Sequence, residues 1–358
     1  MKRRRWSRIA ALLAFCCLCV SVFAVNVLAG KKKKDEITQT LAAPPEPPAA
    51  VAANTRRLVF HTSPLSGRGL LSQQTKDALH DLLRQNEGMQ IVKIRAFVVG
   101  AGDLRRIPQL VGEILGEKKH QQLPAVSVVL GGGLPVEGAQ VALESISEAK
   151  RDVNPNGLLF TGLRKREAER PGQRLSELAD QSIADIAAAL AGHGEVLEVT
   201  CFLTRLEEAS RVTNIIADRF PGATSSVVQA QRAASPQSVA CEAIARAGAV
   251  AGNAPGVVAL NAGRAVFTGT QVAYGFNDDD ARLAFKRLDH VLEGFGTNLK
   301  KAAEIDVYPL SPSIAAQTRK VEPEFVDPSL TAVLEIPFES VPGLDASFAV
   351  EAVAPVTP

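Results

Sequence analysis

The chain has 358 residues, of which 46% are hydrophobic and 22% charged, as is typical of globular proteins rather than disordered or fibrous ones. Only 5% are aromatic, so the composition does not suit a stacking surface for single-stranded nucleic acid. The formal net charge is +2, but residues 1–34 hold nine Lys or Arg and no acid, which leaves −7 for the remainder. Because that remainder is acidic, we expect no nucleic-acid partner.

Residues 1–29 have the features of an export signal. Five basic residues within positions 2–8 precede an uncharged apolar run over 9–25, and Val27-Leu28-Ala29 suits a peptidase that cuts after Ala29. The run is also long, and Lys31 to Lys34 follow it directly, as at the end of a membrane-spanning helix. The sequence is compatible both with a cleaved signal peptide and with an uncleaved signal-anchor. Either exports the rest of the chain to a periplasmic or extracellular location, and a membrane is a partner only if the segment stays uncleaved.

Residues 30–56 form a predicted linker that is rich in Lys and Pro. The run Pro44-Pro45-Glu46-Pro47-Pro48 fits neither a helix nor a central strand, so we expect an extended, semi-stiff spacer.

Two of the five cysteines, Cys201 and Cys241, lie beyond the export signal. In an oxidising compartment they could form a disulfide. Because both sit in apolar, strand-like runs, we favour the alternative of two buried thiols that pack as small apolar side chains.

The rest of the chain repeats one pattern three times. A short apolar strand ends at Phe60, Phe160 and Phe267, spaced by 100 and 107 residues. Apolar residues at intervals of three and four predict a helix after each strand, over 75–85, 175–190 and 278–292. A second strand follows over 91–99, 196–203 and 302–308, and a second helix is clearest over 103–115 and 206–220.

A glutamate on the last strand closes each repeat. Glu144, Glu242 and Glu351 are spaced by 98 and 109 residues, close to the spacing of the phenylalanines. We therefore expect an α+β fold of three β-α-β-α-β-β domains, over residues 57–150, 156–248 and 257–355.

This pattern resembles the Rid family, also called the YjgF/YER057c/UK114 or L-PSP endoribonuclease family. The resemblance covers nearly all of residues 57–355 and rests on short stretches in a shared order: Ile91 to Val98, Leu123 to Val129, Leu134-Pro135, Phe220 to Ser225, Cys241 to Ala245, Phe267 to Gln271, Val341-Pro342-Gly343 and Val350 to Ala354. It implies chorismate-mutase-like domains, which in the family usually assemble as homotrimers with ligand clefts between subunits. Three repeats in one chain then suggest a monomeric, intramolecular pseudo-trimer; loosely strung domains and pairing between chains are the alternatives.

The resemblance also implies a chemistry, which this chain matches only in part. Family deaminases hydrolyse enamines and imines, with an Arg that holds the substrate carboxylate and a last-strand Glu that positions water. The Arg position holds Val126, Thr224 and Leu330 here, whereas Glu144, Glu242 and Glu351 are present. Arg95 or Arg205 could replace the missing guanidinium. The polar positions that the resemblance assigns to ligand binding are His61, Thr62, Thr161, Gly162, Thr224, Ser225, Thr268 and Gly269.

We therefore expect an exported Rid-like protein that binds a small ligand between its repeats or acts as a structural or interaction module. The alternative is an imine or enamine hydrolase that uses a last-strand Glu, with the second repeat favoured because Thr224, Ser225 and Glu242 keep its cleft polar. An endoribonuclease is less favoured because the body is acidic. The five histidines are scattered without metal-ligand spacing, so neither a metal nor a cofactor is expected.

Overall fold

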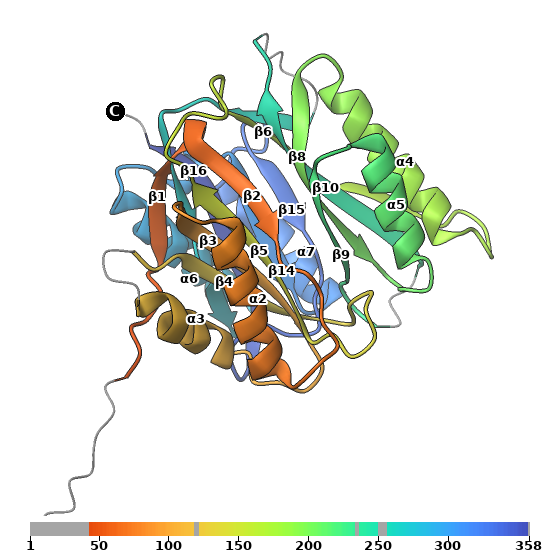
Figure 1. Cartoon of the computed structure of the whole chain (residues 1–358), viewed down its shortest axis with the longest axis horizontal. Coiled ribbons are helices and arrows are strands. Elements are labelled where there is room, and N and C mark those ends of the chain that lie inside the picture. Colours follow the sequence, from red (N-terminus) through yellow and green to blue (C-terminus); the bar gives the residue numbers. More distant parts are fainter. Residues whose placement is uncertain (1–42, 118–121, 233–235, 250–255, 357–358) are drawn as a thin grey trace, which may run out of the picture. The chain divides into compact units, whose positions relative to one another are not determined.

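The computed structural model describes residues 43–117, 122–232, 236–249 and 256–356. Residues 44–358 form one compact unit of helices and three β-sheets (Figure 1). The predicted α+β class is confirmed. The predicted export signal and most of the predicted linker lie outside the described residues. No helix of the described part of the chain is long and apolar enough to cross a membrane.

The first sheet has the strand order β2-β5-β3-β4, in which β3 and β4 are parallel and the other pairs antiparallel. Its elements are β2 Leu58–Thr62, α2 Leu71–Gln85, β3 Gln90–Val99, α3 Arg106–Gly116, β4 Ala125–Gly131 and β5 Val141–Glu148. The helices follow the first and second strands, as the hydrophobic spacing predicts.

The second and third sheets repeat this order with added short strands. The second contains β6 Leu158–Thr161, β7 Arg164–Glu167, α4 Leu175–Leu190, β8 Gly194–Leu203, α5 Ala209–Arg219, β9 Thr224–Gln229 and β10 Ser238–Ala247, and adds β11 Val257–Leu260 at its edge. The third contains β12 Arg264–Thr268, β13 Gln271–Tyr274, α6 Asp278–Glu293, β14 Glu304–Pro309, α7 Pro312–Val321, β15 Ala332–Glu335 and β16 Ala346–Val356, and adds β1 Ala50–Asn54. Three short 3-10 helices complete the described elements: η1 Thr55–Arg57, η2 Leu299–Lys301 and η3 Glu322–Glu324.

Each sheet packs its two helices on one face and turns the other face toward a shared core (Figure 1). The alternation of side chains along a strand produces this division. In β3, Ile94 and Ala96 contact the helix side, whereas Phe97 belongs to the central core. Phe60, Phe160 and Phe267, which mark the repeat in the sequence, are all buried in that central core.

The segments that precede the repeats pair with a neighbouring sheet. β1 pairs with β12 of the third sheet, and β11 pairs with β6 of the second. The predicted linker over 30–56 is therefore wrong at its C-terminal end, because residues 50–54 form a strand. Val51 and Ala53 are buried in the central core, which stabilises a strand that their own sequence hardly indicates.

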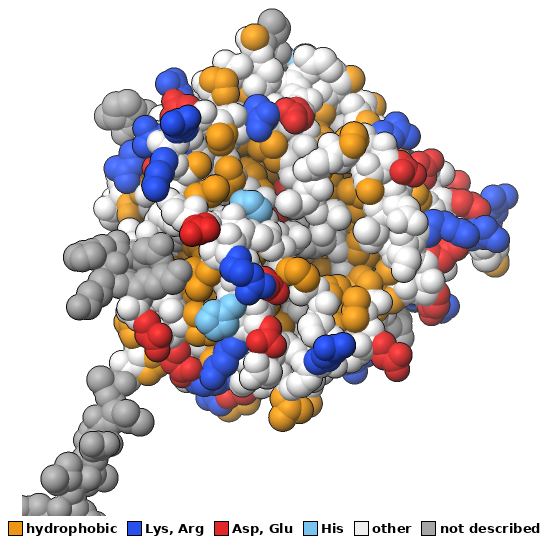
Figure 2. All heavy atoms as spheres, viewed as in Figure 1, with side chains coloured by type: hydrophobic (Ala, Val, Ile, Leu, Met, Phe, Trp, Pro, Cys, Tyr) orange, Lys and Arg blue, Asp and Glu red, His pale blue; other side chains and the backbone are white. Residues whose placement is uncertain are grey.

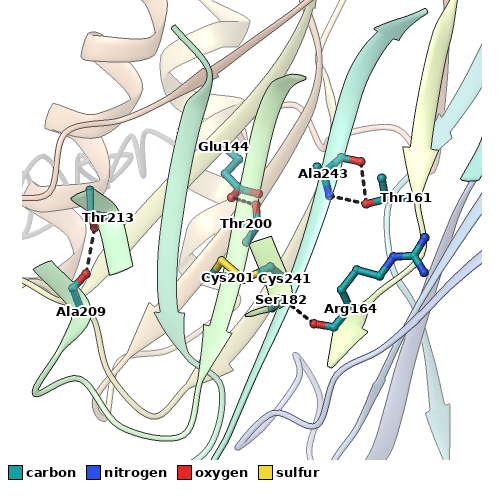
Figure 3. The surroundings of a disulfide bond; sticks show 10 residues. All are labelled: Glu144, Thr161, Arg164, Ser182, Thr200, Cys201, Ala209, Thr213, Cys241 and Ala243. Carbon is teal, nitrogen blue, oxygen red and sulfur yellow. Dashed lines mark hydrogen bonds between the residues drawn. A yellow bond between two sulfur atoms is a disulfide. The ribbon is translucent and has the colours of Figure 1, made fainter. Parts of the chain in front are cut away.

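Cys201 and Cys241 form a disulfide, so the prediction of two free thiols is wrong. The two residues face each other on the adjacent strands β8 and β10, with their Cα atoms 4.1 Å apart. Both point to the helix side of the second sheet, away from Glu144 and Thr200 on the inner side (Figure 3). The apolar surroundings were correctly predicted, but the cross-strand register that brings the two sulfurs together was not.

Candidate functional site

The middle strand of each sheet carries polar side chains to the centre of the molecule. Pairing with the last strand shows that three positions are equivalent: Arg95 lies opposite Glu144, Thr200 opposite Glu242, and Asp306 opposite Glu351. Two residues earlier, on the same inner face, stand Lys93, Glu198 and Glu304. Two residues later stand Phe97, Phe202 and Tyr308, which form an aromatic layer with Phe338.

Eight charged side chains from all three sheets therefore meet, and we call them the central junction: Lys93, Arg95, Glu144, Glu198, Glu242, Glu304, Asp306 and Glu351. Together they line a cavity of about 50 Å³. Space of this size holds on the order of three water molecules.

Arg95 connects the three sheets within the central junction. Its Nε donates to Glu144 at 2.7 Å, and its terminal nitrogens donate to Glu242 at 2.5 Å and to Asp306 at 3.5 Å. It also donates to the hydroxyl of Thr200, which in turn donates to Glu144 at 2.8 Å. Its guanidinium carbon lies 5.2 Å from the centre of the Phe97 ring. Every nitrogen of this guanidinium is thus already engaged by protein groups.

Lys93 connects the first and third sheets in the same way. Its ammonium group donates to Ser127, to the carbonyl oxygen of Thr268 and to Glu351. Glu351 also accepts from the hydroxyl of Tyr308 at 2.6 Å. Each of the three last-strand glutamates is at least nine-tenths buried, and each is bonded by a cation of the first sheet.

The acids of the central junction outnumber its cations by six to two. This imbalance leaves one buried oxygen without a hydrogen-bond partner on each of Glu198, Glu242 and Asp306. Burial raises the pKa of Glu198 and of Asp306 well above the ordinary range, since both would otherwise carry a charge inside the protein. Burial also raises the pKa of Glu242 to about 6, although Arg95 opposes that shift.

The structure brings together only some of the residues that the sequence singles out. Glu144, Glu242 and Glu351 line one central cavity rather than three separate clefts, and Thr268 lines it with them. The hydroxyl of Thr268 accepts from the backbone of Ala352.

The other polar candidates lie elsewhere. Thr161 bonds the backbone of Ala243 within the second sheet, and Thr224 donates to the carbonyl of Leu197 (Figure 3 shows Thr161). Gly162 bonds Gly256 through its backbone. His61 and Thr62 are partly buried near α2, where His61 contacts Asn86 and the carbonyl of Thr62 accepts from Gln85.

The strand register revises the positions assigned to the family's Arg. In β3 and β4, Val126 lies beside Ile94, and the equivalent pairs in the other sheets are Ser225 beside Val199 and Val333 beside Ile305. Ser225 and Val333, rather than Thr224 and Leu330, therefore correspond to Val126. None of the three carries a guanidinium.

Gly269 lies against the backbone of Val126, at a contact between the third and first sheets. A Cβ atom at position 269 would stand 2.8 Å from the Val126 carbonyl oxygen, so only glycine permits this approach. The sequence pattern indicated both residues, but not that they touch.

Sequence reasoning missed Glu198, Glu304 and Asp306. The available signal was a charged or polar residue at every second position of an otherwise apolar strand, as in Glu198-Val199-Thr200 and Glu304-Ile305-Asp306. In isolation this alternation is typical of a strand with one solvent-exposed face, which is why it did not indicate a buried site.

Comparisons with known proteins find structural similarity only. No family model matches the chain, and no curated protein matches it. Among solved structures, a chorismatase is 10% identical, with 83% of this chain and 98% of that chain covered and a TM-score of 0.27. A YjgF/YER057c/UK114-family protein from Mycobacterium tuberculosis is 16% identical, with 26% and 79% covered and a TM-score of 0.24. A YjgF-family protein from Neisseria meningitidis is 14% identical, with 28% and 85% covered and a TM-score of 0.25. Similarities this low carry no argument about function.

Proposed function

We propose that this chain is an exported, Rid-like protein without deaminase activity, in which three repeats pack as an intramolecular pseudo-trimer and act as a structural or interaction module. One observation carries the proposal. The glutamates that would position water in a deaminase are buried in the central junction, where Arg95 and Lys93 bond them.

The size of the cavity supports a role without a substrate. Pockets that bind small organic molecules usually measure about 300–1,000 Å³, several times the volume of about 50 Å³ found at the central junction. A substrate carboxylate would also have to displace Glu144, Glu242 and Asp306 from Arg95 before it could bind there.

Two features support export. The basic and apolar start of the sequence is typical of export signals. The buried disulfide between Cys201 and Cys241 suits an oxidising compartment, because reducing conditions in the cytoplasm disfavour such bonds.

The face of the molecule shown in Figure 2 supports the expectation that nucleic acid is not a partner. On the face shown in Figure 2, acidic and basic side chains lie interspersed among apolar and neutral ones. A surface that neutralises a run of phosphates instead gathers its Lys and Arg side chains into a continuous stripe.

A hydrolase is the second candidate, and the pair Arg95 and Glu242 favours it. Arg95 supplies a guanidinium at the cavity, and Glu242 has a pKa of about 6 and a buried oxygen without a partner. A carboxylate with such a pKa is suited to act as a general base near neutral pH. This candidate requires the cavity to open wide enough for a small imine.

Imine hydrolysis by the purified chain separates the two candidates. The substrates are 2-aminoacrylate and 2-iminobutanoate, released in a coupled assay, with buffer alone as the reference. We expect a rate equal to that of buffer for the wild type. A rate above buffer that Glu242→Gln abolishes would establish the hydrolase instead, provided that circular dichroism shows the variant to be folded.

A further inference from the structure

We propose that the central junction takes up protons when the chain folds, so that packing of the three sheets against one another weakens as the pH rises. The ligand of this site is thus the proton itself. The inference does not depend on whether the chain hydrolyses imines.

The geometry provides oxygens that need a proton or a donor. Glu198, Glu242 and Asp306 are only 6%, 7% and 5% exposed, and each has one buried oxygen without a hydrogen-bond partner. They belong to β8, β10 and β14, so the unsatisfied oxygens come from two sheets that meet at one cavity. An ionised carboxylate left unpaired in such a place strongly destabilises the fold, whereas a protonated one can donate a hydrogen bond.

No further cation of the central junction is available to neutralise these carboxylates. From the first sheet, Lys93 is bonded to Glu351, and Arg95 is shared among Glu144, Glu242 and Asp306. The second and third sheets add further acids, Glu304 among them, and the uncharged hydroxyls of Thr200, Thr268 and Tyr308. Within the described ranges, no three His, Cys, Asp or Glu side chains are placed to hold a metal ion.

The direction of the pH effect follows from the sign of the pKa shifts. Unfolded carboxyl groups lose their protons near pH 4, whereas burial raises the pKa of Glu242 to about 6 and those of Glu198 and Asp306 well above their ordinary values. The folded chain therefore holds more protons than the unfolded chain over this range. The contribution of these groups to the stability of the fold is fully present below the pKa of the unfolded carboxyl groups. It is lost as the pH rises through the folded pKa values, about 6 for Glu242.

The double substitution E198Q/D306N tests this inference, since Gln and Asn have the shape of the protonated acids and cannot ionise. Thermal unfolding of the purified chain is followed between about pH 4.5 and pH 8.5. We expect the Tm of the wild type to fall relative to that of the variant by at least about 4 °C across this range. At the acid end the two should unfold at the same temperature.

Glu322 provides a matched control outside the central junction. It is a single buried acid after α7, and burial beside Glu335 raises its pKa to about 7. E322Q should raise the Tm at alkaline pH relative to the wild type. Because Glu322 shares no partner with the central junction, the Tm difference caused by E198Q/D306N should be the same with and without E322Q.

Equal pH slopes for the wild type and E198Q/D306N would overturn the inference. Should that variant fail to fold, infrared spectroscopy of the wild type decides the question. The carbonyl stretch of protonated carboxylic acids must be present in the native chain at about pH 6, where ordinary carboxyl groups are ionised, and disappear on unfolding in urea. Its absence from the native spectrum would equally refute proton uptake.

Discussion

Arg95 is the side chain around which the central junction is organised. Its planar, permanently charged guanidinium donates in several directions at once, which lets it serve carboxylates of all three sheets. A Lys in this place would offer a compact charge without that fixed fork. Because its nitrogens are already bonded to these carboxylates, Arg95 is poorly placed to bind the carboxylate of a substrate.

Replacing Arg95 by Met keeps much of the side-chain volume and removes the charge. We expect R95M to lose about 3–5 kcal/mol of unfolding free energy in urea at neutral pH, because buried carboxylates lose their cation. The exposed Arg205 provides the control, and R205M should stay within about 0.5 kcal/mol of the wild type. A loss as small as that of the control would show that the acids do not depend on Arg95.

The sequence indicated the right glutamates but not their meeting place. Glu144, Glu242 and Glu351 were predicted as one equivalent set, and the structure keeps that equivalence in the strand register. Their convergence depends on how three sheets face one another, which periodicity within a single strand does not reveal. Arg95 was considered only as a stand-in for a missing residue.

At the scale of elements, the helices and long strands were predicted within a few residues. The helix predicted over 175–190 is α4, with the same bounds, whereas α2 begins at Leu71 rather than at residue 75. The added short strands β1, β7, β11 and β13 escaped prediction because pairing, and not their own composition, stabilises them. β7 reads Arg-Lys-Arg-Glu and exists through its pairing with β10.

The disulfide joins neighbouring strands and closes a loop with a sequence separation of 40 residues. In the chain-entropy description, removing such a link from the unfolded state costs about 3–4 kcal/mol. We expect C201A/C241A to lose about that much stability in urea relative to the oxidised wild type. Added reductant should lower the stability of the wild type and leave that of the double variant unchanged. If reductant destabilises the wild type and the double variant equally, the disulfide is not what stabilises the second sheet.

The leading strand β1 stabilises the third sheet although it precedes the first repeat. Asp at position 51 would place an unpaired carboxylate in the central core, and we expect V51D to lose about 3 kcal/mol or more in urea unfolding. The exposed Ala49 provides the control, and A49D should change stability by less than about 0.5 kcal/mol. Comparable losses in both variants would show that the burial of Val51 is not what makes this position matter.

At the scale of the whole molecule, three helix-covered sheets share one core, and that core contains a charged layer beside an aromatic one. The apolar part of this core follows from hydrophobic patterning, because the long strands of all three sheets contribute alternate residues to it. The charged part does not, since an isolated strand gives no reason to bury Glu198 or Asp306. Polar positions of this kind were predictable as strand residues and not as parts of one site.

The equivalence of Arg95, Thr200 and Asp306 has a genetic consequence. Were one short gene to encode a single repeat that assembled in threes, mutation could only place the same side chain at all three positions. Three guanidinium groups, or three carboxylates, would then crowd the same small space and repel one another. A single chain lets the three equivalent positions differ, so a cation, a hydroxyl and an acid can stand where a symmetric trimer would repeat one side chain.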